Sequence, residues 1–250
     1  MAQDRQAALK ELAPTGAVRV AIAVGPSSSA LWTIRDPASG KPRGVTVELA
    51  GALGRHLGVP VQLVEFESSG EIVKAVDADK WDVTFVPVDA ERKKVLDFAP
   101  NYAVGESTYM AAPGTGITTL AEVDRAGVRV VGVEGTATIR SARRTLKNTE
   151  AIGAKSLDEA VDMIRTGKAD AIALGRDSLV TMAQEMPGAR VMDEAFHATG
   201  TAPAVAKNKA AALACLGEFI EAVKADGTVN QAFKTAGLDE SGVAPAGSRS

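Results

Sequence analysis

The stretch of sequence that decides the fold spans residues 81–102 and reads WDVTFVPVDAERKKVLDFAPNY. Its first half, Val83 to Val88, is an apolar run of strand length and predicts a buried strand. Asp89 follows with the right chemistry to cap a short helix, because its side chain can accept N–H groups of the first turn. Arg92 then lies just beyond the carboxyl end of the strand, where open α/β sheets bind ligands.

Two interpretations of Arg92 stay open at this point. Arg92 and the two lysines after it occupy a first helical turn, where the helix dipole disfavours cations, so Arg92 is a candidate for binding an anion. The alternative is a purely structural ion pair on a solvated surface with Asp89, Glu91 or Asp97.

The same alternation of strands and helices continues on both sides of this stretch. The preceding apolar runs predict strands at 18–24 and 61–66, with a helix over 46–56 between them. After a turn-rich break at 113–116 the pattern starts again, and it predicts further strands at 128–133, 151–154, 171–174 and 190–196. This order is typical of mostly parallel sheets covered by helices, so we expect an α/β protein.

The two halves also echo each other, since residues 79–83 and 167–171 both link an amphipathic helix to a buried strand. A strand at 202–207 then leads to helices over 210–225 and 228–236, which have no sheet of their own and should pack on the first half. Two crossings of the chain predict a hinge over a cleft, a favoured place for ligands. The expected organisation is lobe 1 (17–105 with 204–238), lobe 2 (106–203), a lead-in (1–16) and a flexible tail (239–250).

Composition excludes several classes of function. A net charge of −3 and an aromatic content of 4% argue against nucleic acid as a partner. No apolar run approaches the ~18 residues of a membrane span. Cys215 is the only cysteine, so no internal disulfide can form, and its apolar surroundings predict a core position. The first six residues lack the features of a signal peptide, which fits a cytoplasmic protein or one from which the signal was removed.

The sequence contains few motifs that indicate catalysis. No phosphate loop, dinucleotide fingerprint or nucleophile elbow occurs, and His56 and His197 lack metal-ligand spacing. His56 lies at a predicted helix end, and His197 is assigned either a loop or core role or a ligand contact. We expect no cofactor and no metal.

A second possible anion site lies at residues 134–138, where a strand leads into a helix. Gly135 allows a tight turn, and the backbone N–H groups of Thr136 and Ala137 then point outward as donors. The alternative is an ordinary helix cap. If this turn and Arg92 faced one cleft from opposite lobes, a single carboxylate could bridge them through charge-assisted hydrogen bonds of roughly 1.5–3 kcal/mol each.

Several short phrases, taken in order, resemble the family 3 extracellular solute-binding proteins, the polar-amino-acid receptors of ABC importers. The resemblance covers about Val18 to Gly237, and its carriers are Gly40-Lys41, residues 44–50, 57–59, 80–83, Glu91-Arg92, Asp97-Phe98, Asn101-Tyr102, and residues 133–136, 167–171 and 224–228. It implies a two-lobed, hinged, type II periplasmic-binding-protein fold. It also implies a monomer that works in the periplasm, with its signal peptide removed, and that delivers a small carboxylate ligand to ABC permease subunits.

In that family, an arginine matching Arg92 and a turn matching Gly135 to Ala137 hold the ligand's α-carboxylate, while an aromatic residue near Trp32 packs on the side chain. The full set of residues expected at the ligand is Trp32, Thr84, Val86, Pro87, Asp89, Arg92, Gly135, Thr136, Ala137 and Gly175.

Three positions depart from the family pattern. Pro87 stands where a hydroxyl residue usually helps to hold the ligand's α-ammonium, Gly175 replaces the usual aspartate, and Val45 replaces a second aromatic contact. A desolvated ammonium needs a carboxylate or several acceptors, so the expected ligand is a small carboxylate, either an amino acid or an amine-free acid such as a hydroxy, keto or aromatic acid, and these departures favour the amine-free kind. Asp177, Asp89 or Glu134 could substitute only with a shifted backbone.

Two other classes of function compete with this reading. One is an enzyme resembling cyclohexadienyl dehydratase, which shares the architecture and would need Glu134 or His197 as its general acid or base. The other is a ligand-sensing domain of a larger receptor or regulator.

Overall fold

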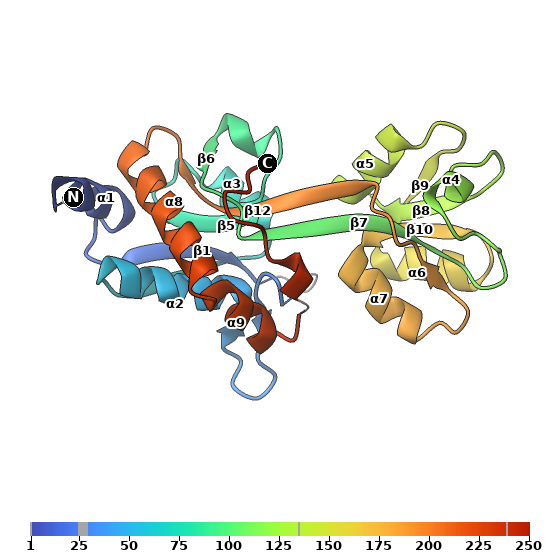
Figure 1. Ribbon diagram of the computed structural model, residues 1–250, viewed down its shortest axis with the longest axis horizontal. Helices are drawn as coiled ribbons and strands as arrows, with labels where there is room; N and C mark the ends of the chain where they lie inside the picture. The colour runs from blue at the N-terminus through green and yellow to red at the C-terminus, as the bar shows by residue number, and fades with distance from the viewer. Residues whose placement is uncertain (1, 25–29, 135, 239) are drawn as a thin grey trace. The chain divides into compact units, whose positions relative to one another are not determined.

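The computed structural model describes residues 2–24, 30–134, 136–238 and 240–250 (Figure 1). The chain divides into two compact units, unit 1 (Met1–Val104 with Gly200–Ser250) and unit 2 (Gly105–Thr199). Strands β7 (Ala103–Ala111) and β12 (His197–Ala206) carry the chain across the two boundaries. The chain therefore leaves unit 1 once and returns once.

The sheet of unit 1 is built around three parallel strands, β4 (Val61–Phe66), β1 (Val18–Ala23) and β5 (Val83–Pro87). Val18 lies opposite Val61 and Val20 opposite Val83. β12 pairs with β5 in the antiparallel sense, and the short β6 (Leu96–Phe98) pairs with β12. β5 is buried along most of its length, as its apolar sequence predicts.

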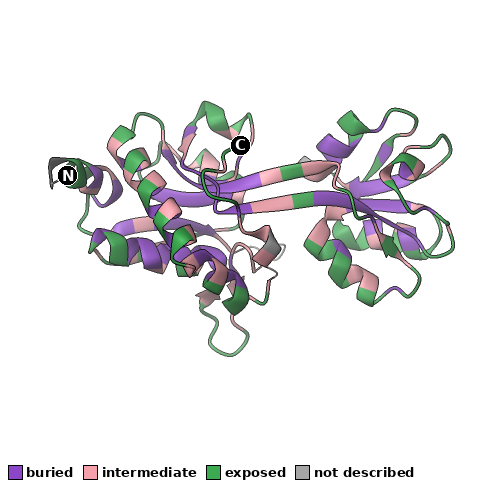
Figure 2. Cartoon of the chain, viewed as in Figure 1, coloured by how far each residue is buried: buried purple, intermediate pink, exposed green. Residues whose placement is uncertain are grey.

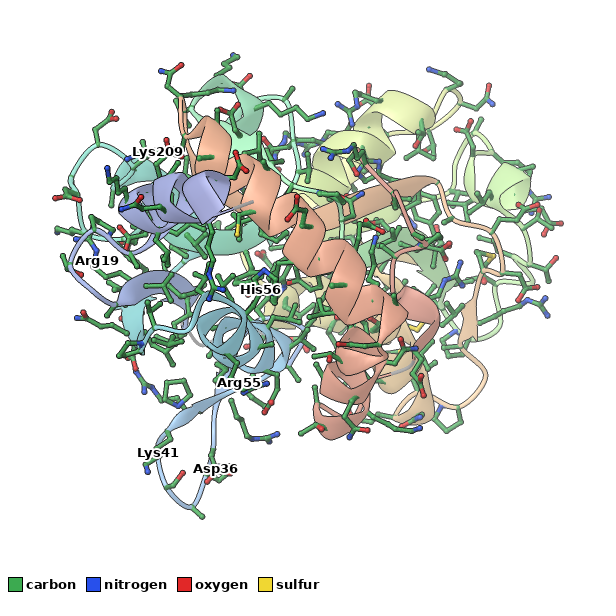
Figure 3. All side chains as sticks on the ribbon, turned by 60° about the vertical axis from the view of Figure 1, so that its left-hand side comes forward. Arg19, Asp36, Lys41, Arg55, His56 and Lys209 are labelled. Atoms are coloured by element: carbon green, nitrogen blue, oxygen red, sulfur yellow. The ribbon has the colours of Figure 1, made fainter. Side chains whose placement is uncertain are left out.

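Helices cover this sheet and supply most of the core of unit 1. They are α1 (Ala2–Leu12), α2 (Val45–Leu57), α3 (Ser69–Lys74), α8 (Ala210–Ala225) and α9 (Thr228–Thr235). α8 packs on α1 and α9 on α2, so the two C-terminal helices pack on the first half as the sequence predicts. At the end of α2, His56 lies beside α8 with its ring 5.4 Å from that of Phe219 (Figure 3).

Short elements complete unit 1. The strands β2 (Ile34–Arg35) and β3 (Pro42–Arg43) form a hairpin whose turn carries Asp36 and Lys41 (Figure 3). The 3₁₀ helices η1 (Arg92–Lys94) and η2 (Glu240–Gly242) lie after β5 and near the C-terminus.

Unit 2 repeats the α/β pattern. Its parallel strands are β10 (Ala171–Gly175), β8 (Val130–Val133) and β9 (Ala151–Ala154), and β7 pairs with β10 in the antiparallel sense. The helices are α4 (Leu120–Val123), α5 (Ala137–Thr145), α6 (Leu157–Arg165) and α7 (Arg176–Gln184).

Each face of this second sheet has its own apolar core. Neighbouring residues of one strand point to opposite faces, so Tyr109 and Val130 belong to one cluster while Met110 and Val131 belong to the other. Figure 2 shows the resulting buried strands between partly exposed helices.

The strand expected at 190–196 is much shorter, because β11 covers only Arg190–Val191. The carbonyl groups that follow are bonded to side chains instead of to a neighbouring strand. Arg176 Nη1 donates to Met192 O and Arg176 Nη2 to Asp193 O, both at 2.8 Å, and Thr108 Oγ1 donates to Glu194 O. β12 in turn begins at His197, five residues before the expected strand at 202.

The tail, expected to be flexible from residue 239 onward, instead packs on unit 1 over its described part. Ala244 is buried, and its N–H donates to Tyr102 O at 3.0 Å. Asn101 N donates to Ser248 O at 2.8 Å, and Val243 forms a β-bridge with Ala103. The small residues of this segment therefore pack against residues 101–103, a contact that the sequence does not predict. Residue 239 lies outside the described ranges.

Candidate ligand site

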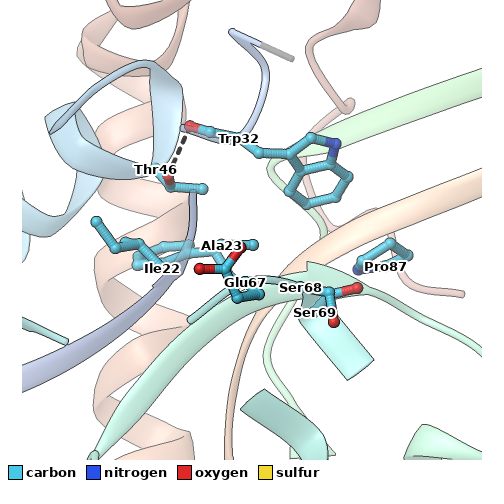
Figure 4. A pocket seen from close by; sticks show the side chains of 9 residues that line it. Ile22, Ala23, Trp32, Thr46, Glu67, Ser68, Ser69 and Pro87 are labelled. Atoms are coloured by element: carbon cyan, nitrogen blue, oxygen red, sulfur yellow. Dashed lines mark hydrogen bonds between the residues drawn. The ribbon is translucent and has the colours of Figure 1, made fainter. Parts of the chain in front are cut away.

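A cavity of about 200 Å³ opens in unit 1 where its parallel strands end (Figure 4). Ile22 and Ala23 reach it from β1, residues 67–69 follow β4 into it, and Phe85 and Pro87 line it from β5. Loops at the carboxyl ends of parallel strands meet at one edge of a sheet, which is the general position of ligand sites in open α/β folds. The cavity is therefore the candidate site of unit 1.

The alternation of β5 decides which of its residues reach the cavity. Phe85 and Pro87 line it, whereas Thr84 and Val86 are buried in the sheet. Thr84 Oγ1 donates to Ala21 O at 3.1 Å, and Val86 packs in an apolar cluster with Trp81 and Leu96. Neither Thr84 nor Val86 lines this cavity. The ligand contacts expected of them stay predictions.

Trp32 forms another wall and is held by the first turn of α2. Thr46 donates to Trp32 O from its backbone N at 3.2 Å and from its Oγ1 at 2.6 Å. Gly44 precedes the helix with φ 136° and ψ 178°, a conformation that is essentially restricted to glycine. A Cβ at position 44 would lie 2.5 Å from Trp32 O, so only glycine permits this close approach. Gly44 and the first turn of α2 therefore hold Trp32 at the wall of the cavity.

Arg92 lies beside the cavity through contacts with two residues that line it. Its Nη1 donates to Pro87 O at 3.1 Å and its Nη2 to Ser69 Oγ at 3.0 Å. Asp89 accepts from Arg92 twice, at Oδ1 from the backbone N (2.8 Å) and at Oδ2 from Nη1 (3.1 Å). Asp89 accepts the first N–H of η1 as predicted, although the N-cap position itself is Glu91, and the interpretation of Arg92 as an ion-pair partner of Asp89 describes its geometry.

The other acids considered for Arg92 pair elsewhere. Glu91 pairs with Lys94, and Asp97 pairs with Lys207, both at 2.7 Å. The guanidinium of Arg92 is largely buried, with 18% of the side chain exposed, and it lies behind Ser69 and Pro87.

The remaining predicted residues lie in unit 2. Thr136 caps α5, since its Oγ1 accepts from Ile139 N at 3.2 Å and donates to Val133 O at 2.8 Å. Thr136 N also donates to Val133 O, at 3.4 Å, so an ordinary helix cap describes this turn. Ala137 begins α5, Gly175 ends β10 and caps α7, and Gly135 lies outside the described residues.

The acid and base candidates of the enzymatic alternative have structural partners. Glu134 forms an ion pair with Arg143 at 2.8 Å, and His197 Nε2 lies 2.7 Å from Thr199 Oγ1. Burial, assisted by the charge of Arg144, lowers the pKa of His197, so its charged form is disfavoured.

The described residues provide no group of three or more His, Cys, Asp and Glu side chains able to hold a metal ion. None of the helices in the described ranges is long and apolar enough to cross a membrane.

Sequence reasoning missed residues 67–69 as part of the site. A signal was available, because these residues directly follow the predicted strand at 61–66, and the rule that singled out Arg92 after its strand applies equally to them.

Residues 21–237 match the family model of the bacterial extracellular solute-binding proteins, family 3, and the chain belongs to this family. It has the two-lobed type II periplasmic-binding-protein fold that the sequence predicts. The family consists of extracellular solute-binding proteins, several of which bind amino acids.

Two curated relatives illustrate the likeness. The glutamine-binding protein of Geobacillus stearothermophilus is 23% identical over 173 residues, which cover 66% of this chain and 64% of that protein. The chain thus matches less than two thirds of that relative's length. The L-cystine-binding protein TcyJ of Escherichia coli (strain K12) is 26% identical over 196 residues, which cover 76% and 72% of the two chains.

A solved structure agrees in fold over nearly the whole chain. An amino acid ABC transporter substrate-binding protein from Streptococcus pneumoniae, bound to L-arginine, superposes with a TM-score of 0.69 at 20% identity. The match covers 93% of this chain and 99% of that one.

Proposed function

We propose that this protein is the solute-binding component of an ABC importer and that the cavity of unit 1 receives a small carboxylate-bearing solute, an amino acid or an amine-free organic acid. The observation that carries the proposal is the cavity itself, at the carboxyl ends of β1, β4 and β5, with Trp32 on its wall and Arg92 beside it. Its volume of about 200 Å³ is smaller than the ~300–1,000 Å³ of sites for drug-sized ligands and suits a single small metabolite.

In this proposal Arg92 binds the carboxylate of the solute. The planar guanidinium is suited to two parallel hydrogen bonds with a carboxylate, and it already contacts two residues of the cavity wall. The solute has to share Arg92 with Asp89, so the Arg92–Asp89 pair loosens or tilts as the carboxylate enters. The predicted cleft, and the sharing of the carboxylate with residues 135–137, stay predictions.

The proposed setting follows from the family. A protein of this kind works as a monomer in the periplasm after removal of a signal peptide, captures its solute there and delivers it to the permease subunits of the importer. The enzymatic alternative gains no support from the described residues, because Glu134 and His197 are engaged with Arg143 and Thr199 and neither lines the cavity of unit 1.

Calorimetric and thermal-shift titrations with amino acids and amine-free carboxylates test this proposal. A solute that binds only the folded state stabilises it by ~2.7 kcal/mol at a hundredfold excess over its dissociation constant. We expect at least one small carboxylate to bind, and Arg92→Ala to weaken it by about tenfold or more. Lys93→Ala, which removes a neighbouring cation outside this cavity, is the matched control. Unchanged affinity in Arg92→Ala would assign Arg92 a purely structural role.

A further inference from the structure

The described residues that line the cavity of unit 1 include a single charged side chain. Of the nine described residues that line it, Glu67 alone has an ionisable side chain. Glu67 follows the end of β4 and is exposed, and across the described part of the chain its carboxylate has no hydrogen bond or ion pair. An anionic group in a ligand cavity without a protein partner is available to a positively charged ligand group.

Two hydrogen bonds hold the segment that follows Glu67. Ser68 caps α3, because its Oγ accepts from Glu71 N at 3.3 Å, and the next residue, Ser69, accepts from Arg92 Nη2 at 3.0 Å. These contacts fix the segment from which the Glu67 side chain projects. Figure 4 shows Glu67 and Trp32 as walls of the same cavity.

Arg92 and Glu67 form no ion pair in the described part of the chain. Arg92 lies behind Ser69 and Pro87, and Asp89 is its ion-pair partner. A solute in the cavity therefore meets the carboxylate of Glu67, the indole of Trp32 and the hydroxyl groups of the serines, with Arg92 beside them. Carboxylates bind ammonium and guanidinium groups through charge-assisted hydrogen bonds, and indole rings attract cations to their faces.

We propose that Glu67, together with the indole of Trp32, forms a subsite for a positively charged nitrogen of the solute. This inference rests on the proposed function and narrows it to solutes that carry a cationic group as well as a carboxylate. It replaces the expectation of an amine-free ligand, which followed from Pro87 and Gly175. In this proposal Glu67 supplies, from a different strand end, a carboxylate in place of the aspartate that Gly175 replaces.

The cationic nitrogen is either the α-ammonium of an amino acid or a charged group at the far end of its side chain. Four acids with the same six-carbon skeleton separate these sources. Caproate has no nitrogen, norleucine has only the α-ammonium, ε-aminocaproate has only the terminal ammonium, and lysine has both.

The test is calorimetric titration of these four acids into the wild-type protein, Glu67→Gln and Glu71→Gln. Glu71 is a matched control, because it is an exposed glutamate of α3 that does not line the cavity. We expect at least one nitrogen-bearing acid to bind the wild-type protein about tenfold or more tightly than caproate. That preference should disappear in Glu67→Gln and persist in Glu71→Gln. Since Glu67 is exposed and has no partner among the residues that the structure describes, its amide variant should fold normally.

Three results would overturn the inference. If caproate binds the wild-type protein as tightly as the other acids, the proposed function stands and the cation subsite does not. If Glu67→Gln keeps the preference for nitrogen-bearing acids, another residue holds the nitrogen. Binding of none of the four acids, even at millimolar concentration, counts against both this inference and the proposed function.

Discussion

Arg129 donates three hydrogen bonds to Asp170, and Arg19 forms the same three with Asp82 in the other unit. In unit 2 the arginine N and Nε donate to Oδ2 at 2.8 and 2.9 Å and its Nη2 to Oδ1 at 2.6 Å. The corresponding distances in unit 1 are 2.9, 3.0 and 2.7 Å. Each aspartate belongs to one of the two similar phrases, 79–83 and 167–171. The two similar phrases therefore reflect the same arginine–aspartate pair. In each unit this pair, called a clamp below, joins the starts of two neighbouring parallel strands.

The two clamps differ in burial, which predicts unequal costs of removing the aspartate. The Asp82 and Arg19 side chains are only 4% and 13% exposed, against 22% and 48% for Asp170 and Arg129. We expect Asp82→Ala to lower the free energy of unfolding by about 3–5 kcal/mol, because it leaves a largely buried cation without this partner. Asp170→Ala should cost about 1 kcal/mol. Amide hydrogen exchange in β5 and β10 measures the two units separately, and equal losses would contradict the argument.

Gly44→Ala should disturb both stability and binding. The backbone strain alone costs about 1–3 kcal/mol, and the new Cβ also pushes Trp32 O away and moves the cavity wall. Gly51→Ala is the control, since a Cβ there meets only Arg55 Nη1 at 3.5 Å and should stabilise α2 by roughly 0.5–1 kcal/mol. Thermal melts and solute titrations of both variants check this, and a neutral Gly44→Ala would show that Trp32 does not depend on this glycine.

Tyr102→Phe should stabilise the protein. The ring is fully buried and packs edge-on against Phe85 at 5.7 Å, while the hydroxyl finds no hydrogen-bond partner among the described residues. The same burial raises the pKa of the hydroxyl, which therefore stays neutral. An unsatisfied buried polar group costs about 1–3 kcal/mol, so removing it while keeping the ring should raise the melting temperature. A fall in melting temperature would mean that the hydroxyl makes a bond in solution.

His197 predicts a pH dependence near neutrality. Its pKa in the folded protein lies below the ordinary value, because burial and Arg144 disfavour the imidazolium. The unfolded chain therefore binds this proton first, and the contribution of His197 to stability is present above about pH 6.5 and is lost as the pH falls through the folded pKa. The decrease in melting temperature between about pH 7 and pH 5 should be smaller in His197→Gln than in the wild-type protein. Equal pH profiles for His197→Gln and the wild-type protein would contradict the assignment.

The sequence predicts the architecture well and the site only in part. Apolar runs such as Val83 to Val88 locate most of the strands, because burial on both faces of a parallel sheet demands them. The extent of β11 and the packing of residues 240–250 depend on residues distant in sequence, Arg176 and Asn101, so local patterns cannot reveal them. Whether Arg92 pairs with Asp89, Glu91 or Asp97 depends on backbone geometry that spacing leaves open. The position of Glu67 directly after the strand at 61–66 is the pattern that singled out Arg92, and it is the sequence signal for this residue.

The most direct test of the central claim, that a solute enters the cavity of unit 1, is the fluorescence of Trp32. The chain has two tryptophans, and the second, Trp81, is buried with its Nε1 donating to Ile72 O at 3.1 Å. Trp81→Phe therefore leaves Trp32 as the only tryptophan, on the cavity wall. Titration with a solute that binds by calorimetry should change the Trp32 emission saturably, with the same dissociation constant. Calorimetric binding with unchanged Trp32 emission would place the solute elsewhere and contradict the proposed site.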